Sequence, residues 1–454
     1  MPKIRNRGAI LALLTLVYAF NFIDRQIVGV LAPFIKADLA LSDTQIGLLS
    51  GAVFAIFYTF LGIPIASLVD NTRTLRIGGF ALRFDRTTII ALSLATWSVF
   101  TLLTGLAGGF VALALLRVGV AVGEAGGSPP SHALLSDLYP PNERARALGI
   151  YALGIPFGIM VAYFAGAFFV SGGQVDWRAA FIVVGALGLP LALAIKVLLP
   201  EPERGRTDGP VVPVLPFGQA VGKLLAIPSY WTMALGIAFA SFGSYAVSAF
   251  LVVYIRQAFP EIPLVPLYIG LGIGNATFYA GGTFLGGVVA DRFGRSNVGA
   301  YAASPAIATA IAACVLAMAW LTGSALVHFV GIAAFVFFSG SYLGPSFSVA
   351  QNLAGISVRA TSTAVFFFVL NLIAMGGGPS LVGWLSDVFA AQTGDPLIGL
   401  RRALLSLSVT YVVSVVMFTL TAMLLPRDWR RAREADATEV ATVRAGAADS
   451  SPAS

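Results

Sequence analysis

The sequence contains little charge and almost no cysteine or histidine. Lys, Arg, Asp and Glu make up 11% of its 454 residues, against roughly 25% in soluble globular domains. Hydrophobic residues make up 57%, and the mean hydropathy is +0.87. Single hydrophobic cores stop growing at about 250 to 300 residues, so this much apolar material cannot form one core. These values exclude an ordinary soluble enzyme and predict a protein embedded in lipid.

Reactive and metal-binding motifs are missing from the sequence. Its one cysteine, Cys314, cannot form an internal disulfide or a Cys-x-x-Cys pair. The two histidines, His132 and His328, have no His-Glu-x-x-His context, so we expect no metal site and no cofactor. The sequence has no Gly-x-Ser-x-Gly element of the kind that would indicate a hydrolase. Residues 218–224 approach the pattern of a phosphate-binding loop but are one residue short of it. The sequence therefore predicts neither an enzyme nor an ATP-driven pump.

Apolar runs long enough to cross a membrane, about 20 residues each, recur along the whole chain. Twelve spans are predicted, at residues 8–34, 45–69, 87–108, 110–137, 145–170, 178–199, 229–256, 264–290, 297–321, 325–352, 360–386 and 402–425. With both termini in the cytoplasm, 21 of the 28 Lys and Arg residues lie on the cytoplasmic side and five on the opposite side, as the positive-inside rule requires. Topology thus explains the net charge of +7, and no nucleic-acid partner is expected.

Polar segments and repeated landmarks divide the chain into two halves. We predict an N-terminal six-helix bundle at residues 1–199, a cytoplasmic linker at 200–226, a C-terminal six-helix bundle at 227–426 and a disordered cytoplasmic tail at 427–454. Asp70 and Asp291 are 221 residues apart, and so are Gly158 and Pro379. The expected fold is therefore an all-α membrane protein of two pseudo-symmetric bundles, which is typical of transporters that hold substrate between repeated halves.

Four ionisable residues lie far from the ends of predicted spans: Asp24 and Arg25 in the first, and Arg117 and Glu124 in the fourth. Such groups at membrane depth are candidate functional residues. A carboxylate in a low-dielectric cavity binds protons more strongly, and a nearby arginine opposes this, so Asp24 and Glu124 are candidate proton-coupling residues. The alternative is that Asp24 with Arg25, or Arg117 with Glu124, forms a fixed structural ion pair.

The predicted spans also carry aromatic and amide side chains that suit a binding cavity. Candidate substrate or gating residues, besides the two arginines, are Asn21, Phe54, Tyr58, Tyr245 and Asn371. An apolar cavity with one charged end suits an amphipathic molecule better than a sugar, which needs many polar partners. For each residue, helix packing or interhelical hydrogen bonding is an equally good account.

The loop after the eighth span, Gly287-Val-Val-Ala-Asp291-Arg292-Phe-Gly-Arg295, resembles the signature of the major facilitator superfamily. Arg117-Val-Gly-Val-Ala-Val-Gly is similar to another element of that superfamily. In the first half, Asp70 stands at the corresponding position, but a second pair, Asp85-Arg86, precedes the third span. The resemblance implies conformational-switch loops that contain these residues, and it leaves open whether Asp70 or Asp85 serves the first half.

Within that superfamily, the chain resembles the Spinster family, which moves lysolipids and sphingoid lipids such as sphingosine-1-phosphate. The resemblance rests on Asn21-x-x-Asp24-Arg25, the Gly-Glu124-Ala of the fourth span and the stretch at 378–387. It implies a secondary transporter of an amphipathic lipid-like solute that works by alternating access, with Asp24, Arg25 and Glu124 in proton coupling and gating. A drug or organic-anion transporter, or an uncoupled facilitator, is the alternative.

The same interpretation predicts the partners and the location of the protein. The partners are a small amphipathic substrate, protons and membrane lipids, and the protein is expected to be a monomer. We place it in a bacterial-type inner membrane with both termini in the cytoplasm. The first apolar stretch is expected to be a permanent span, because it is too long for a signal peptide and has no small-residue cleavage site.

Overall fold

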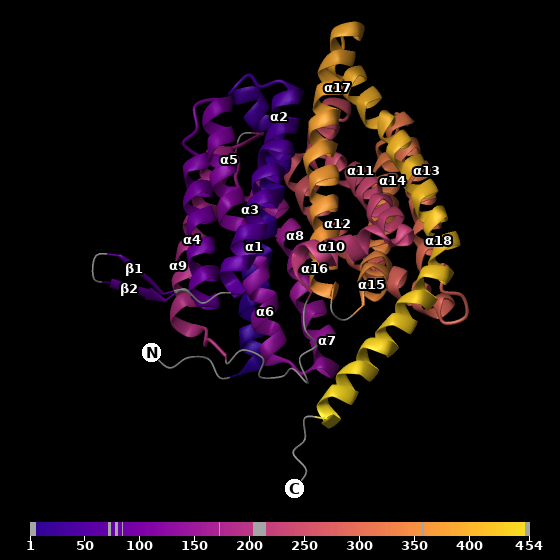
Figure 1. Cartoon of the computed structure of the whole chain (residues 1–454). Coiled ribbons are helices and arrows are strands. Elements are labelled where there is room, and N and C mark those ends of the chain that lie inside the picture. The colour runs from indigo at the N-terminus through magenta and orange to yellow at the C-terminus, as the bar shows by residue number, and fades with distance from the viewer. Residues whose placement is uncertain are drawn as a thin grey trace. The chain divides into compact units, whose positions relative to one another are not determined.

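The computed structural model describes residues 6–70, 74–77, 80–83, 85–171, 173–202, 215–355 and 358–449, and these are mainly helical (Figure 1). The helices of the first half are α1 (Arg7–Asp38), α2 (Asp43–Ser50), α3 (Ala52–Asp70), α4 (Arg86–Thr104), α5 (Phe110–Ala125), α6 (Ser128–Leu138), α7 (Pro141–Ala152), α8 (Gly154–Phe168) and α9 (Trp177–Leu198). Those that follow are α10 (Phe217–Leu225), α11 (Pro228–Ala258), α12 (Leu264–Gly294), α13 (Ala300–Leu321), α14 (Ala325–Ser341), α15 (Leu343–Ala354), α16 (Arg359–Leu370), the π-helix η2 (Asn371–Gly377), α17 (Gly378–Thr393) and α18 (Pro396–Asp449).

These helices follow the predicted spans closely. Eleven helical segments among the described residues are long and apolar enough to cross a membrane. The predicted span at 264–290 corresponds to α12, which has 31 residues and is also long enough, although it is rich in glycine. Several spans are interrupted: the second is broken at Gly51 between α2 and α3, and the eleventh contains the π-helix η2. Interruptions of this kind are tolerated where neighbouring helices satisfy the backbone.

Two short antiparallel hairpins join helices. Strands β1 (Thr74–Ile77) and β2 (Phe80–Arg83) pair in the loop between α3 and α4, with Thr74 opposite Arg83. Strands β3 (Val170–Ser171) and β4 (Gln174–Val175) pair between α8 and α9. The first hairpin accounts for the unusual length of the loop after the second predicted span.

The chain divides into two compact units, each continuous in space but not in sequence. The first contains Met1–Gly209, Tyr245–Thr277 and Met375–Leu404, and the second contains Pro210–Ser244, Phe278–Ala374 and Leu405–Ser454. The first unit therefore combines the helices of the first predicted bundle with all of α17 and with parts of α11, α12, η2 and α18. The division into two six-helix bundles at residue 200 stays a prediction.

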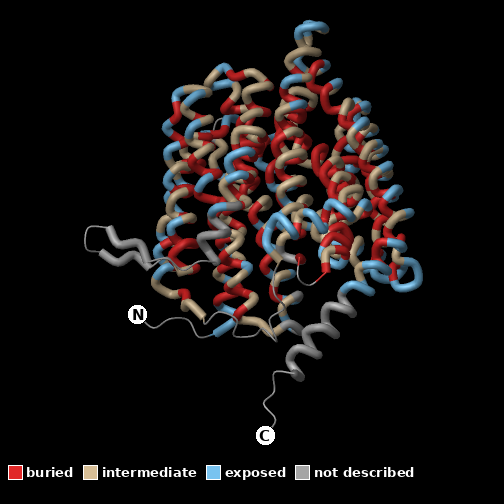
Figure 2. Tube along the Cα trace, viewed as in Figure 1, coloured by how far each residue is buried: buried red, intermediate tan, exposed pale blue. Residues whose placement is uncertain are grey.

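Glycines allow the helices of the first unit to pack closely. A Cβ atom at Gly123 would lie 2.6 Å from the backbone nitrogen of Trp97, and one at Gly158 would lie 2.3 Å from the carbonyl oxygen of Ala19. Helix pairs α4–α5 and α1–α8 meet at these points. Small residues permit such backbone approach in membrane proteins, where there is no hydrophobic drive between helices. Buried residues accordingly follow the inner sides of the helices (Figure 2).

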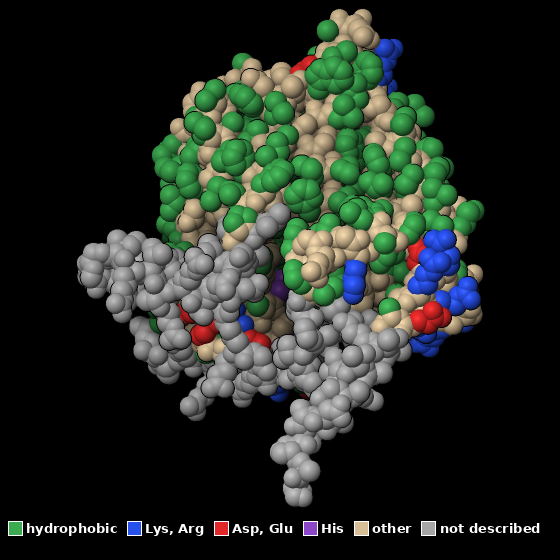
Figure 3. Space-filling model, viewed as in Figure 1, with side chains coloured by type: hydrophobic (Ala, Val, Ile, Leu, Met, Phe, Trp, Pro, Cys, Tyr) green, Lys and Arg blue, Asp and Glu red, His purple; other side chains and the backbone are tan. Residues whose placement is uncertain are grey.

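The outward faces of the helices are apolar. Large hydrophobic side chains are exposed along them, including Leu115, Leu193, Phe284 and Val409, and hydrophobic side chains cover much of the face seen in Figure 3. On a soluble protein such a surface would be an aggregation hazard, so it fits contact with lipid.

The last helix differs from the sequence prediction. Composition predicts disorder from residue 427, but α18 continues to Asp449. The reason is local, since the stretch after residue 428 is rich in Ala, Arg and Glu, which have high helix propensity. The linker expected at 200–226 contains the short helix α10, and its residues 203–214 lie outside the described part of the chain.

Candidate functional site

An ion pair at membrane depth joins the first and fourth predicted spans. Arg25 of α1 donates from Nε to Oε2 of Glu124 on α5 at 2.7 Å, and the Glu124 side chain is fully buried while that of Arg25 is 13% exposed. Arg25 lies 18 residues from the start of α1, about 27 Å along the helix at 1.5 Å per residue. Glu124 lies near the end of α5 but in the middle of the 29-residue span Phe110–Leu138 that α5 and α6 form together, so both groups are far from either end of their span.

Three aromatic rings surround the Arg25 guanidinium. Its central carbon lies 4.3 Å from the ring centroid of Tyr58 and 5.3 Å from those of Phe22 and Phe54. Cation–π attraction of this kind is strongest where water is excluded. Phe54 and Tyr58, predicted from the sequence as cavity residues, thus contact the charged centre directly.

Arg117 and Asp24, the other two charged residues of the centre, do not form either of the predicted ion pairs. Arg117 donates to the backbone carbonyl oxygens of Asp24 at 3.1 Å and of Leu49 at 3.4 Å, and it faces the Phe54 ring at 4.8 Å. The salt bridge that forms is Arg25–Glu124, between helices, rather than Asp24–Arg25 or Arg117–Glu124. Adjacent residues on a helix do not face each other, which explains why Asp24 and Arg25 do not pair.

Several buried oxygens at this centre have no hydrogen-bond partner within the described residues. They are Oδ1 of Asn21, Oδ1 of Asp24 and Oε1 of Glu124. Buried polar atoms are almost always hydrogen-bonded, and polar side chains do lie beside both carboxyl groups: Thr101 beside Asp24 and Asn21 beside Glu124. Chemically, the arrangement can bind and release protons next to a cation held among aromatic rings.

The two remaining predicted cavity residues belong to different compact units. Tyr245, near the middle of α11, is half-buried and packs with Tyr58 against the hydrophobic core of the first unit. Asn371 begins the π-helix η2, belongs to the second unit and is buried.

An aromatic row that the sequence interpretation missed leads away from Arg25 within the first unit. Tyr18 contacts the edge of Phe22 with ring centroids 5.1 Å apart and stacks on Tyr151 of α7 at 4.4 Å. Tyr151 in turn meets the imidazole of His132 on α6 at 5.2 Å, and His132 is exposed. The available signal was helical spacing, because Tyr18, Phe22 and Arg25 lie at positions i, i+4 and i+7.

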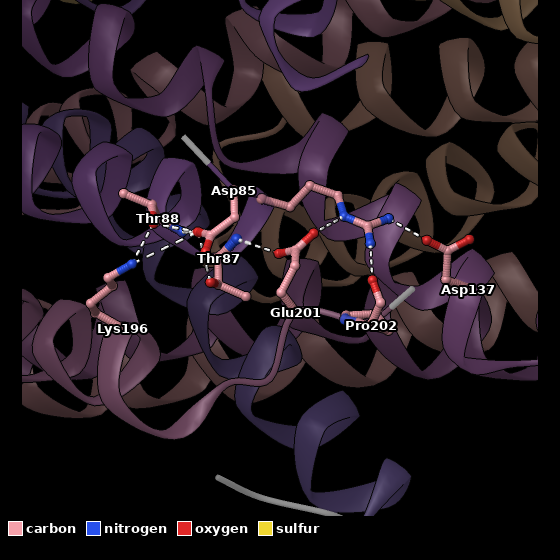
Figure 4. A network of polar contacts seen from close by, with 8 residues as sticks. Asp85, Thr87, Thr88, Asp137, Lys196, Glu201 and Pro202 are labelled. Atoms are coloured by element: carbon pink, nitrogen blue, oxygen red, sulfur yellow. Dashed lines mark hydrogen bonds and ion pairs between the residues drawn. The ribbon is translucent and has the colours of Figure 1, made fainter. Parts of the chain in front are cut away.

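A second polar network surrounds the Asp85-Arg86 pair (Figure 4). Asp85 is the N-cap of α4 and accepts from the backbone nitrogen of Thr88 at 2.7 Å. Arg86 is buried and donates to Asp137 of α6, to Oε1 of Glu201 at 2.6 Å and to the carbonyl oxygen of Pro202 at 2.9 Å. A buried carboxylate, Asp137, and a half-buried one, Glu201, thus converge from distant segments on one arginine.

Asp85 also faces a cation from another helix. Nζ of Lys196, on α9, lies 3.8 Å from Oδ1 of Asp85 and donates to the Thr88 hydroxyl. Burial raises the pKa of Asp85, but hydrogen bonds from Thr88 and Thr87 and the charge of Lys196 outweigh it, so the pKa lies below its usual value. The backbone of Asp70 ends α3, but its side chain lies outside the described residues.

The corresponding loop of the second half is more open. Asp291, Arg292 and Arg295 are exposed at the end of α12, where Asp291 accepts from the Tyr301 hydroxyl at 3.1 Å. Gly287, the first residue of the predicted signature, is not a point of close helix packing, because a Cβ atom there would meet nothing within 4 Å. The close approach is at Gly286 instead, where a Cβ atom would lie 2.2 Å from the Ser341 carbonyl oxygen.

Comparison with known proteins fits this architecture. The sequence profile described as Major Facilitator Superfamily matches residues 14–379. A crystal structure of a bacterial homologue of the human lysosomal transporter Spinster, in an inward-facing and unoccupied conformation, superposes with a TM-score of 0.82 at 29% identity, covering 93% of this chain and 98% of that one.

Two curated relatives align over nearly the whole chain. An MFS-type efflux pump of Mycolicibacterium smegmatis is 28% identical, over 93% of this chain and 94% of its own length. The mouse sphingosine-1-phosphate transporter SPNS2 is 26% identical, over 93% of this chain and 78% of its own length.

The chain belongs to the major facilitator superfamily, and it is a multi-pass integral membrane transporter rather than an enzyme. Within the superfamily it is Spinster-like, as the structural match and the SPNS2 relative show. The predicted all-α fold of twelve spanning helices is thereby confirmed.

Proposed function

We propose that this transporter moves an amphipathic, lipid-like solute by alternating access, coupled to protons through Asp24 and Glu124. The observation that carries the proposal is the buried Arg25–Glu124 ion pair, enclosed by Phe22, Phe54 and Tyr58. A charged group beside apolar walls matches a solute with a polar head and an apolar chain. The Spinster-like relatives support a lysophospholipid or a molecule like sphingosine-1-phosphate as the substrate.

Proton coupling is supported by the unsatisfied oxygens of the site. Asp24 Oδ1 and Glu124 Oε1 are buried without hydrogen-bond partners in the described chain, and each lies close to an arginine that competes with the proton. In this proposal a change in the contacts of Arg25 or Arg117 between two conformations changes the proton affinity of a carboxylate. Asn21, one turn before Asp24, and Tyr245 are proposed to contact the substrate or to gate its passage beside these charges.

The proposal includes topology and location. Both termini face the cytoplasm of a bacterial-type cell, because this orientation places most Lys and Arg residues inside. The protein acts as a monomer with one bundle at 1–199 and the other at 227–426. Asp85 and Arg86 serve as the switch element of the first half, with Asp70 as the alternative carboxylate, and Asp291, Arg292 and Arg295 with Gly287 serve the second half.

A second candidate function has its own support. The M. smegmatis relative is named an efflux pump, so export of apolar drugs or organic anions is the alternative substrate class. An uncoupled facilitator would use the same cavity with Asp24 and Glu124 as fixed structural charges.

The test is uptake of a labelled lysophospholipid and of sphingosine-1-phosphate into proteoliposomes across an imposed pH gradient. The variants are Asp24→Asn and Glu124→Gln, which keep the side-chain shape but do not carry the transported proton. Asp38→Asn is the matched control, since Asp38 lies on the same helix α1, is exposed and pairs with Arg178 at 2.9 Å. We expect the gradient to drive flux in the wild type and the control and to lose its effect in the two site variants.

Each other result has a definite meaning. Flux that ignores pH and both site substitutions would make the carboxylates structural and the protein a facilitator. Movement of organic cations or anions without either lipid would favour the drug-transporter alternative. Size-exclusion profiles of the variants must match the wild type for the comparison to stand.

A further inference from the structure

The end of α17 is held to the start of α2 by one carboxylate. Oδ2 of Asp387 accepts from the backbone nitrogen of Thr44 at 2.8 Å and from its hydroxyl at 2.6 Å. Oδ1 accepts from the backbone nitrogen of Asp43 at 3.1 Å. An anion on the first turn of a helix is favoured by the free N–H groups and the helix dipole. More than 340 residues separate these partners along the chain.

A second carboxylate extends the contact to α1. Asp43 is buried, and it accepts from the Ser386 hydroxyl at 2.7 Å and from Nζ of Lys36 at 2.5 Å. The contact thus connects the end of α1, the start of α2 and the end of α17 through charge-assisted hydrogen bonds, which are stronger than neutral ones.

The helix α2 does not need Asp387 for its own stability. Ser42 already caps it, accepting from the backbone nitrogen of Gln45 at 3.2 Å, while the Gln45 side chain accepts from the Ser42 nitrogen at 3.0 Å. This reciprocal capping box is complete within α2. The carboxylate of Asp387 is therefore an addition whose structural effect is to bind two distant segments together.

The backbones at this contact are as close as they can be. A Cβ atom at Gly47 would lie 2.3 Å from the Pro379 carbonyl oxygen, and one at Gly383 would lie 2.2 Å from that of Asp43. Ser380 also donates to the Gly47 carbonyl oxygen at 3.4 Å. Such a fit has two states, packed or separated, rather than a graded range.

We infer that Asp387 is a positioning residue of the transport cycle: by binding the first turn of α2 it keeps the extracytoplasmic ends of α2 and α17 together, and this contact is released each time that side opens. The inference rests on the proposed alternating access and orientation, in which the loop between α1 and α2 and the end of α17 lie outside the cytoplasm. Asp387 acts on the conformational equilibrium and has no contact with substrate in this role.

The test measures the distance between the end of α17 and the loop between α4 and α5, which belongs to the same predicted bundle as α2. In full-length protein carrying Cys314→Ser, nitroxide labels are placed at Gly108→Cys and Gln392→Cys. Gly108 follows α4, where a Cβ atom meets nothing within 4 Å, and Gln392 is exposed at the end of α17. Double electron–electron resonance then gives the distance distribution in lipid nanodiscs without any substrate.

We expect Asp387→Ala to raise the ratio of the long-distance to the short-distance population by about tenfold or more, because it removes three hydrogen bonds to a charged group. Asp387→Asn keeps an acceptor and gives a smaller shift. Thr44→Val removes only the hydroxyl donor and also gives a smaller shift, whereas Thr44→Ser preserves it and behaves as the wild type.

The matched control is Asp176→Asn. Asp176 is likewise a carboxylate on the first turn of a helix, accepting from the Ala179 nitrogen at 3.0 Å, but it caps its own helix α9. The Asp176→Asn substitution should leave the distance distribution between the two labels unchanged. An Asp387→Ala protein that elutes normally and shows the wild-type distance distribution would overturn the inference. If Asp387→Ala does not fold, a wild-type distance distribution in Thr44→Val would overturn it instead. Because the distance measurement needs no transported substrate, a failed lipid-flux assay would refute the proposed substrate without affecting this result.

Discussion

Replacing Arg86 by glutamine should destabilise the protein strongly, because it removes the cation shared by two carboxylates. The side chains of Arg86 and Asp137 are 4% and 8% exposed, and that of Glu201 is 24% exposed. Breaking a buried ion pair from one side costs about 3–5 kcal/mol, since the partner charge stays in a site of low polarity. For a cooperative unit of about 200 residues, each kcal/mol lowers Tm by roughly 2–4 °C, so the expected loss is about 6 °C or more.

The chain offers a matched control in Arg7→Gln. Nη1 of Arg7 lies 3.7 Å from Oε2 of Glu143, with side chains 53% and 50% exposed, and such surface pairs contribute about 0–1 kcal/mol. The assay is thermal unfolding of purified protein in one detergent, followed by intrinsic tryptophan fluorescence, which includes the buried Trp97. Equal shifts for the two variants would refute the reasoning, because they would show that burial of Arg86 has no energetic consequence.

Two further predictions concern the same unit. Asp85 has a lowered pKa, so the stabilisation from its charge should be complete above about pH 4, its unfolded pKa, and be lost as pH falls through the lower folded value. Asparagine caps a helix about as well as aspartate, so the difference in Tm between wild type and Asp85→Asn isolates this charge and should shrink only at acid pH. Gly47→Ala should cost about 1–3 kcal/mol by overpacking against Pro379, whereas Gly62→Ala, where a Cβ atom meets nothing within 4 Å, should be neutral or stabilising in the same melts.

Much of the fold follows from the sequence, because each spanning helix is specified by its own apolar run. The apolar runs around Asp24, Arg25 and Glu124 also predicted that these charged residues lie at membrane depth, and their role in proton coupling stays a prediction. Their pairing did not follow, since spacing along one helix says nothing about the neighbour 99 residues away that Glu124 contacts.

The missed features share this non-local origin. Asp387 was visible within a motif, but its partners lie in α2, and nothing in the local sequence indicates them. The aromatic row from Phe22 to His132 joins three helices and was hidden because phenylalanine and tyrosine are common throughout the spans. In the first-half loop, only the contacts of Arg86 with Asp137 and Glu201 distinguish its setting from that of an ordinary topology-setting arginine.

The charges of the central site connect proton binding to substrate chemistry. When both carboxylates are ionised, Asp24 and Glu124 cancel the charges of Arg25 and Arg117, and the buried site is neutral overall. A proton on either carboxylate, as proposed, leaves one excess positive charge, and that charge favours a bound anionic head group because an uncompensated charge at membrane depth is costly. Loss of the proton removes the excess positive charge and with it the favourable interaction with an anionic head group. Protonation and binding of an anionic solute therefore reinforce each other at this site, whereas a cationic solute would compete with the proton, and the sign of the pH effect on substrate affinity distinguishes the two.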